Sequence, residues 1–381
     1  MSGKAARPDT GLKRGLTGRR MVVCVGPGGV GKTTVAAAIG LGAAVDGARV
    51  LVCTIDPARR LANALGLSSL GNVESRVPEH KFTEAGLRPK GALFAMMLDV
   101  KRTWDDLVTR HAPDPARRER ILKNRLYQQM SSALAGSQEY MAMEKLYELA
   151  TDRDYDVVVL DTPPTAHALD FLDAPDRILD FLGNETARAL LAPAAAAGKI
   201  GLRLAQLGGG YIAKTLARFT GQAVLSDLAD FLQSFQGMYE GFKERAAEVH
   251  ALLGSPEVGF VLVTSPSPVA ISEVLAFHER LHAESMPIAG LVANRVTPDL
   301  WTGGPLPDGR ALARALGGAA RDQGLGDRLA VTLAEHQALA VSERRALERL
   351  FRAIDAPQVV VPRLETDVHD LAGLARLCER L

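Results

Sequence analysis

The sequence predicts an α/β fold in which helices sandwich a mostly parallel sheet. Short runs rich in β-branched residues alternate with helical patterns, and they lie at 21–25, 49–55, 92–98, 155–161, 258–264, 288–294 and 358–361. These runs are apolar nearly throughout, as strands of a parallel sheet are when both faces are buried. Strands that are separated by helices imply right-handed crossover connections.

Two long helical stretches interrupt this alternation, at 99–149 and 176–254. We interpret them as insertions that together form a helical client or effector subdomain. The remaining segments, 20–98, 150–175 and 255–381, then form the sheet domain. Residues 1–19 are basic and lack an apolar run, so the expectation for them is a disordered leader rather than a secretory signal.

The composition is that of an ordinary globular protein, with 47% hydrophobic and 23% charged residues among 381. A net charge of +1 gives no electrostatic basis for binding nucleic acid. No apolar run approaches the roughly 20 residues that span a bilayer, so stable membrane insertion is not expected. The three cysteines form no C-x-x-C pair, which argues against a disulfide scaffold and favours a cytoplasmic protein.

A phosphate-binding motif follows the first predicted strand, in the stretch GPGGVGKTT at 26–34. Gly26, Gly31, Lys32 and Thr33 satisfy the pattern G-x-x-x-x-G-K-[ST] between a strand and a helix. The glycines let backbone N–H groups turn toward phosphates, and the helix N-terminus adds partial positive charge. Lys32 is expected to reach the outer phosphates and the Thr33 hydroxyl to bind Mg²⁺. The motif therefore predicts a P-loop NTPase.

Two aspartates end later strands, where the ligand crevice of a parallel sheet opens. Asp56, in TIDPARRL, could orient or deprotonate the water that attacks the γ-phosphate, or it could cap the helix that Pro57 begins. Asp161, in VVVLDTPPTAH, follows an apolar run and is suited to hold Mg²⁺ through its water shell. His167, in the same stretch, is open to three interpretations: a γ-phosphate sensor, a partner contact or a packing residue.

Together, GPGGVGKTT, TIDPARRL and DTPPTAH resemble the ArsA family of anion-pump and tail-anchored-protein-targeting ATPases, within the wider class of MinD, ParA and nitrogenase iron protein. The resemblance implies ATP with Mg²⁺ as the bound species. It also implies that Asn294, in GLVANRV, reads adenine and that Pro362 lies near the base. The rest of the implied nucleotide loop is Gly28, Gly29, Val30 and Thr34.

The resemblance further implies a homodimer, or a heterodimer with a paralogue, that closes over two ATP molecules. Pro27 replaces the lysine that in this family reaches across to the partner's nucleotide. A paralogous subunit could supply that charge, or Arg59 or Arg60 could supply it within the chain; alternatively, both arginines are merely solvated or ion-paired. The cysteine cluster that binds arsenite in the family is absent, so arsenite transport is not expected.

Methionines concentrate in the first helical stretch, where Met96, Met97, Met130, Met141 and Met143 lie. Flexible methionines are common on surfaces that bind varied apolar partners, but they also fill cores. We therefore expect an ATP-hydrolysing dimeric switch whose helical groove takes a hydrophobic protein or lipid client. The alternatives are a low-activity regulatory subunit of a heterodimer and a positioning ATPase like MinD or ParA.

Overall fold

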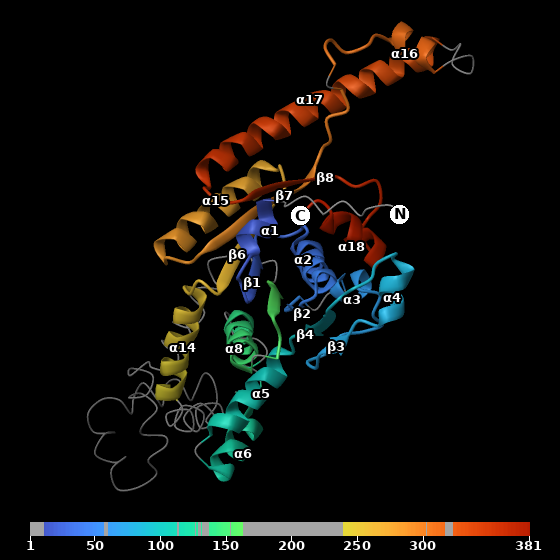
Figure 1. The fold of residues 1–381 in the computed structure, drawn as a ribbon. Coiled ribbons are helices and arrows are strands. Elements are labelled where there is room, and N and C mark those ends of the chain that lie inside the picture. The colour runs from blue at the N-terminus through green and yellow to red at the C-terminus, as the bar shows by residue number, and fades with distance from the viewer. Residues whose placement is uncertain are drawn as a thin grey trace.

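The protein is built on an eight-stranded sheet whose strand order is β3-β4-β2-β5-β1-β6-β7-β8 (Figure 1). The computed structural model describes residues 11–56, 60–112, 114–125, 127–128, 131, 137–152, 154–162, 239–301, 303–316 and 323–381. The strands are β1 (Met21–Val25), β2 (Arg49–Thr54), β3 (Ser75–Arg76), β4 (Ala92–Met97), β5 (Val157–Asp161), β6 (Val258–Thr264), β7 (Ile288–Val296) and β8 (Gln358–Pro362). Every neighbouring pair is parallel except β3–β4, which confirms the predicted fold class.

The seven predicted strands all form, with ends that shift by at most two residues. The sequence analysis missed β3, because a two-residue edge strand carries no detectable alternation of apolar and polar residues.

Side chains alternate between two hydrophobic clusters, one on each face of the sheet. In β1, for example, Val22 and Cys24 join one cluster while Met21, Val23 and Val25 join the other. Helices α2 (Lys32–Asp46) and α18 (Leu371–Cys378) cover the first face, and α8 (Ser137–Asp152), α15 (Pro268–Ala283) and the end of α17 (Gln323–Ala353) cover the second. The strands are therefore buried on both faces, as their apolar composition predicts.

Four described helices extend from the second face, away from α2 and α18 (Figure 1). They are α5 (Val100–His111), α6 (Pro115–Lys123), α8 and α14 (Tyr239–Leu253). Asp99 and Asp114 cap α5 and α6 by accepting hydrogen bonds from the third backbone N–H that follows each. Helix α6 begins at Pro115, a position where the fixed φ and missing N–H of proline are tolerated. Of the second predicted insertion, 176–238 lies outside the described residues, so the two-insertion subdomain stays a prediction.

A helical arm projects from the opposite end of the molecule and was not anticipated within the predicted sheet domain (Figure 1). It consists of α16 (Gly309–Ala315) packed against the first half of α17. The second half of α17 joins the core through Leu347 and Leu350. Two further short helices among the described residues are α3 (Arg60–Ala64) and α4 (Glu79–Glu84).

The prediction of a disordered leader over 1–19 is wrong for its second half, where Gly11–Leu16 form helix α1. Leu12 is buried in the core, and α1 lies against β7 and β8. A Cβ at Gly15 would stand 1.9 Å from the Ala289 carbonyl oxygen, so glycine is what permits this close approach. The basic composition of the segment concealed one apolar helical face. Among the described residues, no helix has both the length and the apolar character needed to cross a membrane.

Candidate functional site

The loop between β1 and α2 has the backbone shape of a phosphate cradle. Gly26 and Gly31 adopt φ values of 149° and 97°, which other residues rarely adopt. A Cβ would stand 2.0 Å from the Val263 carbonyl oxygen at Gly26 and 2.4 Å from the Asn294 amide nitrogen at Gly31. Both glycines are therefore required by conformation and by space, and the loop leads directly into the N-terminus of α2.

Lys32, the first residue of α2, directs its ammonium group back into this loop. Its Nζ donates to the carbonyl oxygens of Gly26 at 2.8 Å and Pro27 at 2.9 Å. Burial lowers the pKa of Lys32, although the Asp161 and Asp56 carboxylates oppose this shift. Lys32 is thus a buried cation that hydrogen-bonds to two neutral carbonyl oxygens of the loop.

Asp161, at the end of β5, presents a buried carboxylate to the same loop. Its Oδ2 accepts a 2.8 Å hydrogen bond from the Thr54 hydroxyl at the end of β2. Its Oδ1 is buried, and no partner among the described residues meets hydrogen-bonding distance and angle. Burial raises the pKa of Asp161 to about 6, while Thr33, Thr54 and Lys32 all act to lower it. The Asp161 carboxylate oxygen that lacks a hydrogen bond and the nearby Thr33 hydroxyl are both oxygen ligands of the kind that Mg²⁺ prefers.

One cavity, of about 740 Å³, brings most of the predicted site residues together, although Gly26, Gly28, Val30 and Asp161 are not among the described residues that line it. It falls within the size range of small-molecule sites. Its lining includes Gly29, Gly31, Lys32, Thr33, Thr34, Asp56, Arg60, Thr162, Asn294 and Pro362. Residues from five separate predicted segments therefore meet at one place. Arg59 and the stretch 163–170, which includes His167, lie outside the described residues.

Asn294, at the end of β7, contacts the phosphate loop directly. Its Nδ2 donates to the Val30 carbonyl oxygen at 2.8 Å, and its Oδ1 accepts from the backbone N–H of Arg295 at 2.9 Å. The side chain is nearly buried but still lines the cavity. Pro362, the last residue of β8, lines the same cavity. Contact with adenine stays a prediction for both residues.

Comparison with known proteins identifies the group to which this site belongs. The family model of the anion-transporting ATPases matches residues 19–303. The chain belongs to that family. It is 27% identical to ATPase GET3 of Rhodotorula glutinis over 254 residues, which are 67% of this chain and 61% of that protein. It is 29% identical to Uncharacterized protein SCO2128 of Streptomyces coelicolor over 307 residues, 76% of this chain and 67% of that one.

A third relative of this chain is ATPase GET3B of Arabidopsis thaliana. Identity is 26% over 300 residues, which are 74% of this chain and 65% of that protein. The chain thus spans about three fifths to two thirds of the length of these curated relatives.

Sequence reasoning missed two arginines at this ATPase-family site. Arg295 adopts a left-handed backbone conformation with φ of 61°, and its Nη1 donates to the Gly29 carbonyl oxygen at 2.7 Å. Arg295 and Arg363 line both the 740 Å³ cavity and a neighbouring cavity that Pro27 also lines. Their positions directly after Asn294 and Pro362 were the available signal. Pro27 is not among the described residues that line the 740 Å³ cavity.

Three of the four described methionines of the predicted cluster are part of the core. Met96, Met141 and Met143 are almost completely buried, and Tyr140 packs with them. Met97 is half-buried, and Met130 lies outside the described residues. The described part of this region therefore supports the core-packing interpretation of these side chains, and the client groove stays a prediction.

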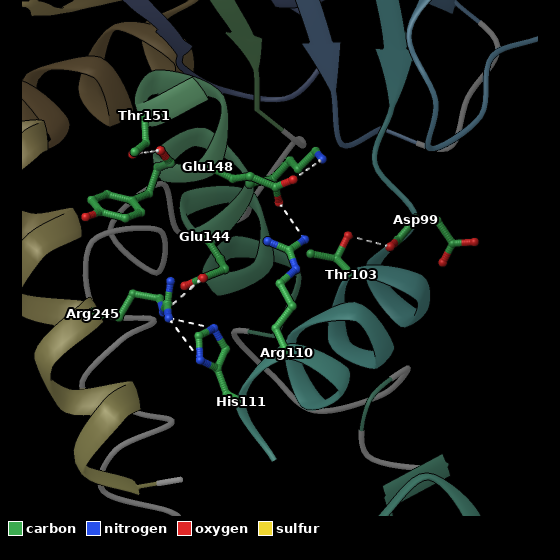
Figure 2. Close-up of polar contacts among 10 residues, drawn as sticks. Asp99, Thr103, Arg110, His111, Glu144, Glu148, Thr151 and Arg245 are labelled. Carbon is green, nitrogen blue, oxygen red and sulfur yellow. Dashed lines mark hydrogen bonds and ion pairs between the residues drawn. The ribbon is translucent and has the colours of Figure 1, made fainter. Parts of the chain in front are cut away.

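A second polar cluster joins α5, α8 and α14 of this ATPase-family protein (Figure 2). Arg245 on α14 contacts Glu144 on α8 at 3.1 Å and the His111 ring on α5 at 2.6 Å. Arg110 on α5 donates to Glu148 on α8 at 3.0 Å. Burial raises the pKa of Glu144 to about 7, although Arg245 and Arg110 oppose the rise. These contacts fix the three helices relative to one another.

Proposed function

We propose that this protein binds ATP with Mg²⁺ and hydrolyses it to ADP and phosphate, as a dimeric switch. The observation that carries the proposal is the buried, incompletely satisfied carboxylate of Asp161 beside Lys32 and Thr33. A buried carboxylate oxygen without a donor is unfavourable in a purely structural role. Membership in a family of ATPases supports the same reaction.

The backbone N–H groups of the phosphate loop and of the α2 N-terminus bind the phosphate oxygens in this proposal. Lys32 exchanges its carbonyl contacts for the outer phosphates. The Thr33 hydroxyl and the Asp161 carboxylate would hold Mg²⁺, which would supply positive charge to neutralise the charge that develops on those phosphates. Asp56, on the same cavity, orients the attacking water and accepts its proton.

Asp56→Asn tests this assignment. An amide keeps the shape of the side chain but is a poor proton acceptor, so the variant should bind ATP with nearly wild-type affinity and lose turnover. Isothermal calorimetry and steady-state hydrolysis give the two quantities. Equal losses in affinity and rate would instead support the helix-capping interpretation of Asp56. Asp46→Asn is the matched control, because Asp46 lies at the far end of α2 in an exposed ion pair with Lys13.

We further propose that two chains face each other across their nucleotides, as a homodimer or a heterodimer with a paralogue. The chain carries one phosphate-loop motif, so a paired site requires a second chain. Light scattering of Asp56→Asn with ATP and Mg²⁺ should give the mass of a dimer. A monomer, at concentrations well above the nucleotide affinity, would contradict the proposal.

The helical region is the proposed client or effector part, for a hydrophobic protein or a lipid. What supports this is its connection to the site: α8 precedes β5, which ends in Asp161, and α14 precedes β6 beside the phosphate loop. Hydrolysis measured with a hydrophobic helical peptide, with liposomes and with DNA should show stimulation by the peptide or the liposomes. Stimulation by DNA alone would favour a positioning role instead.

A low-activity regulatory subunit is the second candidate, and Pro27 is the observation that favours it. Proline supplies no cation at the place where the family carries its lysine. In that case, adding a lysine-bearing paralogue should accelerate hydrolysis well beyond the rate of either protein alone.

A further inference from the structure

Thr54 ends β2 with its side chain completely buried. Its register partner in the neighbouring parallel strand β5 is Asp161. Side chains of register partners point to the same face of a sheet, and here both residues share the face of α2 and the phosphate loop. The pairing is therefore set by the backbone register of two central strands.

The Thr54 hydroxyl makes two hydrogen bonds that serve different parts of the site. It donates to Asp161 Oδ2 at 2.8 Å and accepts from the backbone N–H of Asp56 at 3.2 Å. A hydroxyl has one hydrogen to donate and lone pairs to accept, so one atom completes both contacts. Thr54 thus connects the proposed Mg²⁺ carboxylate to the backbone of the proposed water-orienting residue.

Two further backbone contacts hold the same junction. The Ile55 N–H donates to the Asp161 carbonyl oxygen at 3.2 Å, and the Leu98 N–H donates to the Thr54 carbonyl oxygen at 2.9 Å. These contacts fix the strand end, but neither reaches the Asp161 carboxylate. Among the described residues, the Thr54 hydroxyl is the group that hydrogen-bonds to both the Asp161 side chain and the Asp56 backbone.

We propose that the Thr54 hydroxyl is a positioning group that sets the Asp56 backbone relative to the Asp161 carboxylate, and so aims the Asp56 side chain at the attacking water. This inference rests on the ATPase function proposed above. Reactive groups must be held within a fraction of an ångström, and a misplacement of about 1 Å can cost on the order of 100-fold in rate. Valine has the shape of threonine but neither hydrogen bond, whereas serine keeps both.

The experiment compares Thr54→Val and Thr54→Ser with the wild type in single-turnover hydrolysis and in calorimetry of ATP with Mg²⁺. Thr54→Val should lower the rate about 10- to 100-fold, with an affinity within about threefold of the wild type, because the loop and Lys32 are untouched. Thr54→Ser should restore the rate to within about threefold. Thr103→Val is the matched control: it removes another buried threonine hydroxyl, which donates to the Asp99 carbonyl oxygen in α5.

Amide hydrogen exchange at Asp56 supplies a readout that does not require hydrolysis. With ADP and Mg²⁺ bound, the Asp56 amide should exchange faster in Thr54→Val than in the wild type or in Thr54→Ser. If the wild type does not hydrolyse ATP, the proposed function fails, while this exchange rate still decides whether the hydroxyl holds Asp56.

Three results would overturn the inference. They are a wild-type hydrolysis rate in Thr54→Val, an equally slow Thr54→Ser, and unchanged exchange at the Asp56 amide. A loss of ATP affinity in Thr54→Val as large as its loss of rate would also contradict a positioning role, because it would assign the hydroxyl to binding.

Discussion

The side-chain amide of Asn294 donates a 2.8 Å hydrogen bond to the carbonyl oxygen of Val30, and so joins the end of β7 to the phosphate loop. The same side chain accepts from the backbone N–H of Arg295, whose guanidinium binds the Gly29 carbonyl oxygen. Two consecutive residues of β7 therefore support two consecutive residues of the loop. Asn294 and Arg295 would therefore support the loop in the same way whichever base a bound nucleotide carries.

We predict that Asn294→Ala weakens the binding of ATP and GTP by similar factors, of about 5- to 10-fold. A lost hydrogen bond of about 1 kcal/mol to a loop that binds phosphates should not distinguish the two bases. Calorimetry with both nucleotides measures this. A loss confined to ATP would instead support the adenine contact that the family resemblance implies.

Lys32→Ala should abolish nucleotide binding or weaken it by orders of magnitude. The change removes the one lysine of the phosphate loop and leaves the Gly26 and Pro27 carbonyl oxygens without their donor. The control is Lys13→Ala, because Lys13 forms an exposed ion pair with Asp46 at the other end of α2. Wild-type ATP affinity in Lys32→Ala would refute the assignment of the loop.

Arg60 should contribute mainly to the rate of hydrolysis, whereas Arg295 should contribute mainly to the affinity for the nucleotide. Arg60 is exposed on the cavity, so Arg60→Ala should slow single-turnover hydrolysis by at least about tenfold with little change in affinity, as a supplied cation does. Arg295 is held against Gly29, so Arg295→Ala should mainly weaken affinity. Arg59→Ala is measured in the same way, because Arg59 is the other arginine that could supply the cation. Wild-type rates in both the Arg59 and the Arg60 variants would favour a lysine supplied by a partner subunit.

Glu144 should make the folded state less stable as the pH rises. Burial raises its pKa to about 7 in the folded protein, so between about pH 4.5 and 7 the folded state keeps a proton that the unfolded chain releases. The wild type should therefore lose stability relative to Glu144→Gln across this range, by on the order of 3 kcal/mol. Urea unfolding at several pH values measures the difference.

Glu148→Gln is the control for Glu144. Although burial opposes it, hydrogen bonding to Arg110 and the charge of Lys145 lower the pKa of Glu148. Its stabilising contribution is present above its unfolded pKa and is lost only as the pH falls toward its lower folded value. The stability difference between the wild type and Glu148→Gln should therefore stay flat between about pH 5 and 8. A flat difference for Glu144→Gln as well would refute the assigned burial effect.

The sequence was sufficient to locate seven strands of the sheet and to predict that Lys32, Thr33, Asp56 and Asp161 lie near one strand edge, because each lies in a contiguous motif at the end of an apolar strand; their roles stay predictions. It was insufficient for Thr54 and Arg295, whose contacts depend on the register and spacing of strands that are far apart along the chain. Nor did composition reveal that Met141 and Met143 face the core, because a methionine-rich helix has the same sequence pattern whether it lies against a sheet or lines an open groove.

The order of the three central strands, β5-β1-β6, has a mechanical consequence. The two helices that share the Glu144–Arg245 ion pair precede the two outer strands of this trio. β5 ends in Asp161, and the Val263 carbonyl oxygen of β6 lies against Gly26. Both outer strands are hydrogen-bonded to β1, so the phosphate loop lies between two strand ends that the sheet holds in register. A change where either helix joins its strand would therefore reach the loop through continuous sheet backbone, with no flexible segment needed at the loop itself.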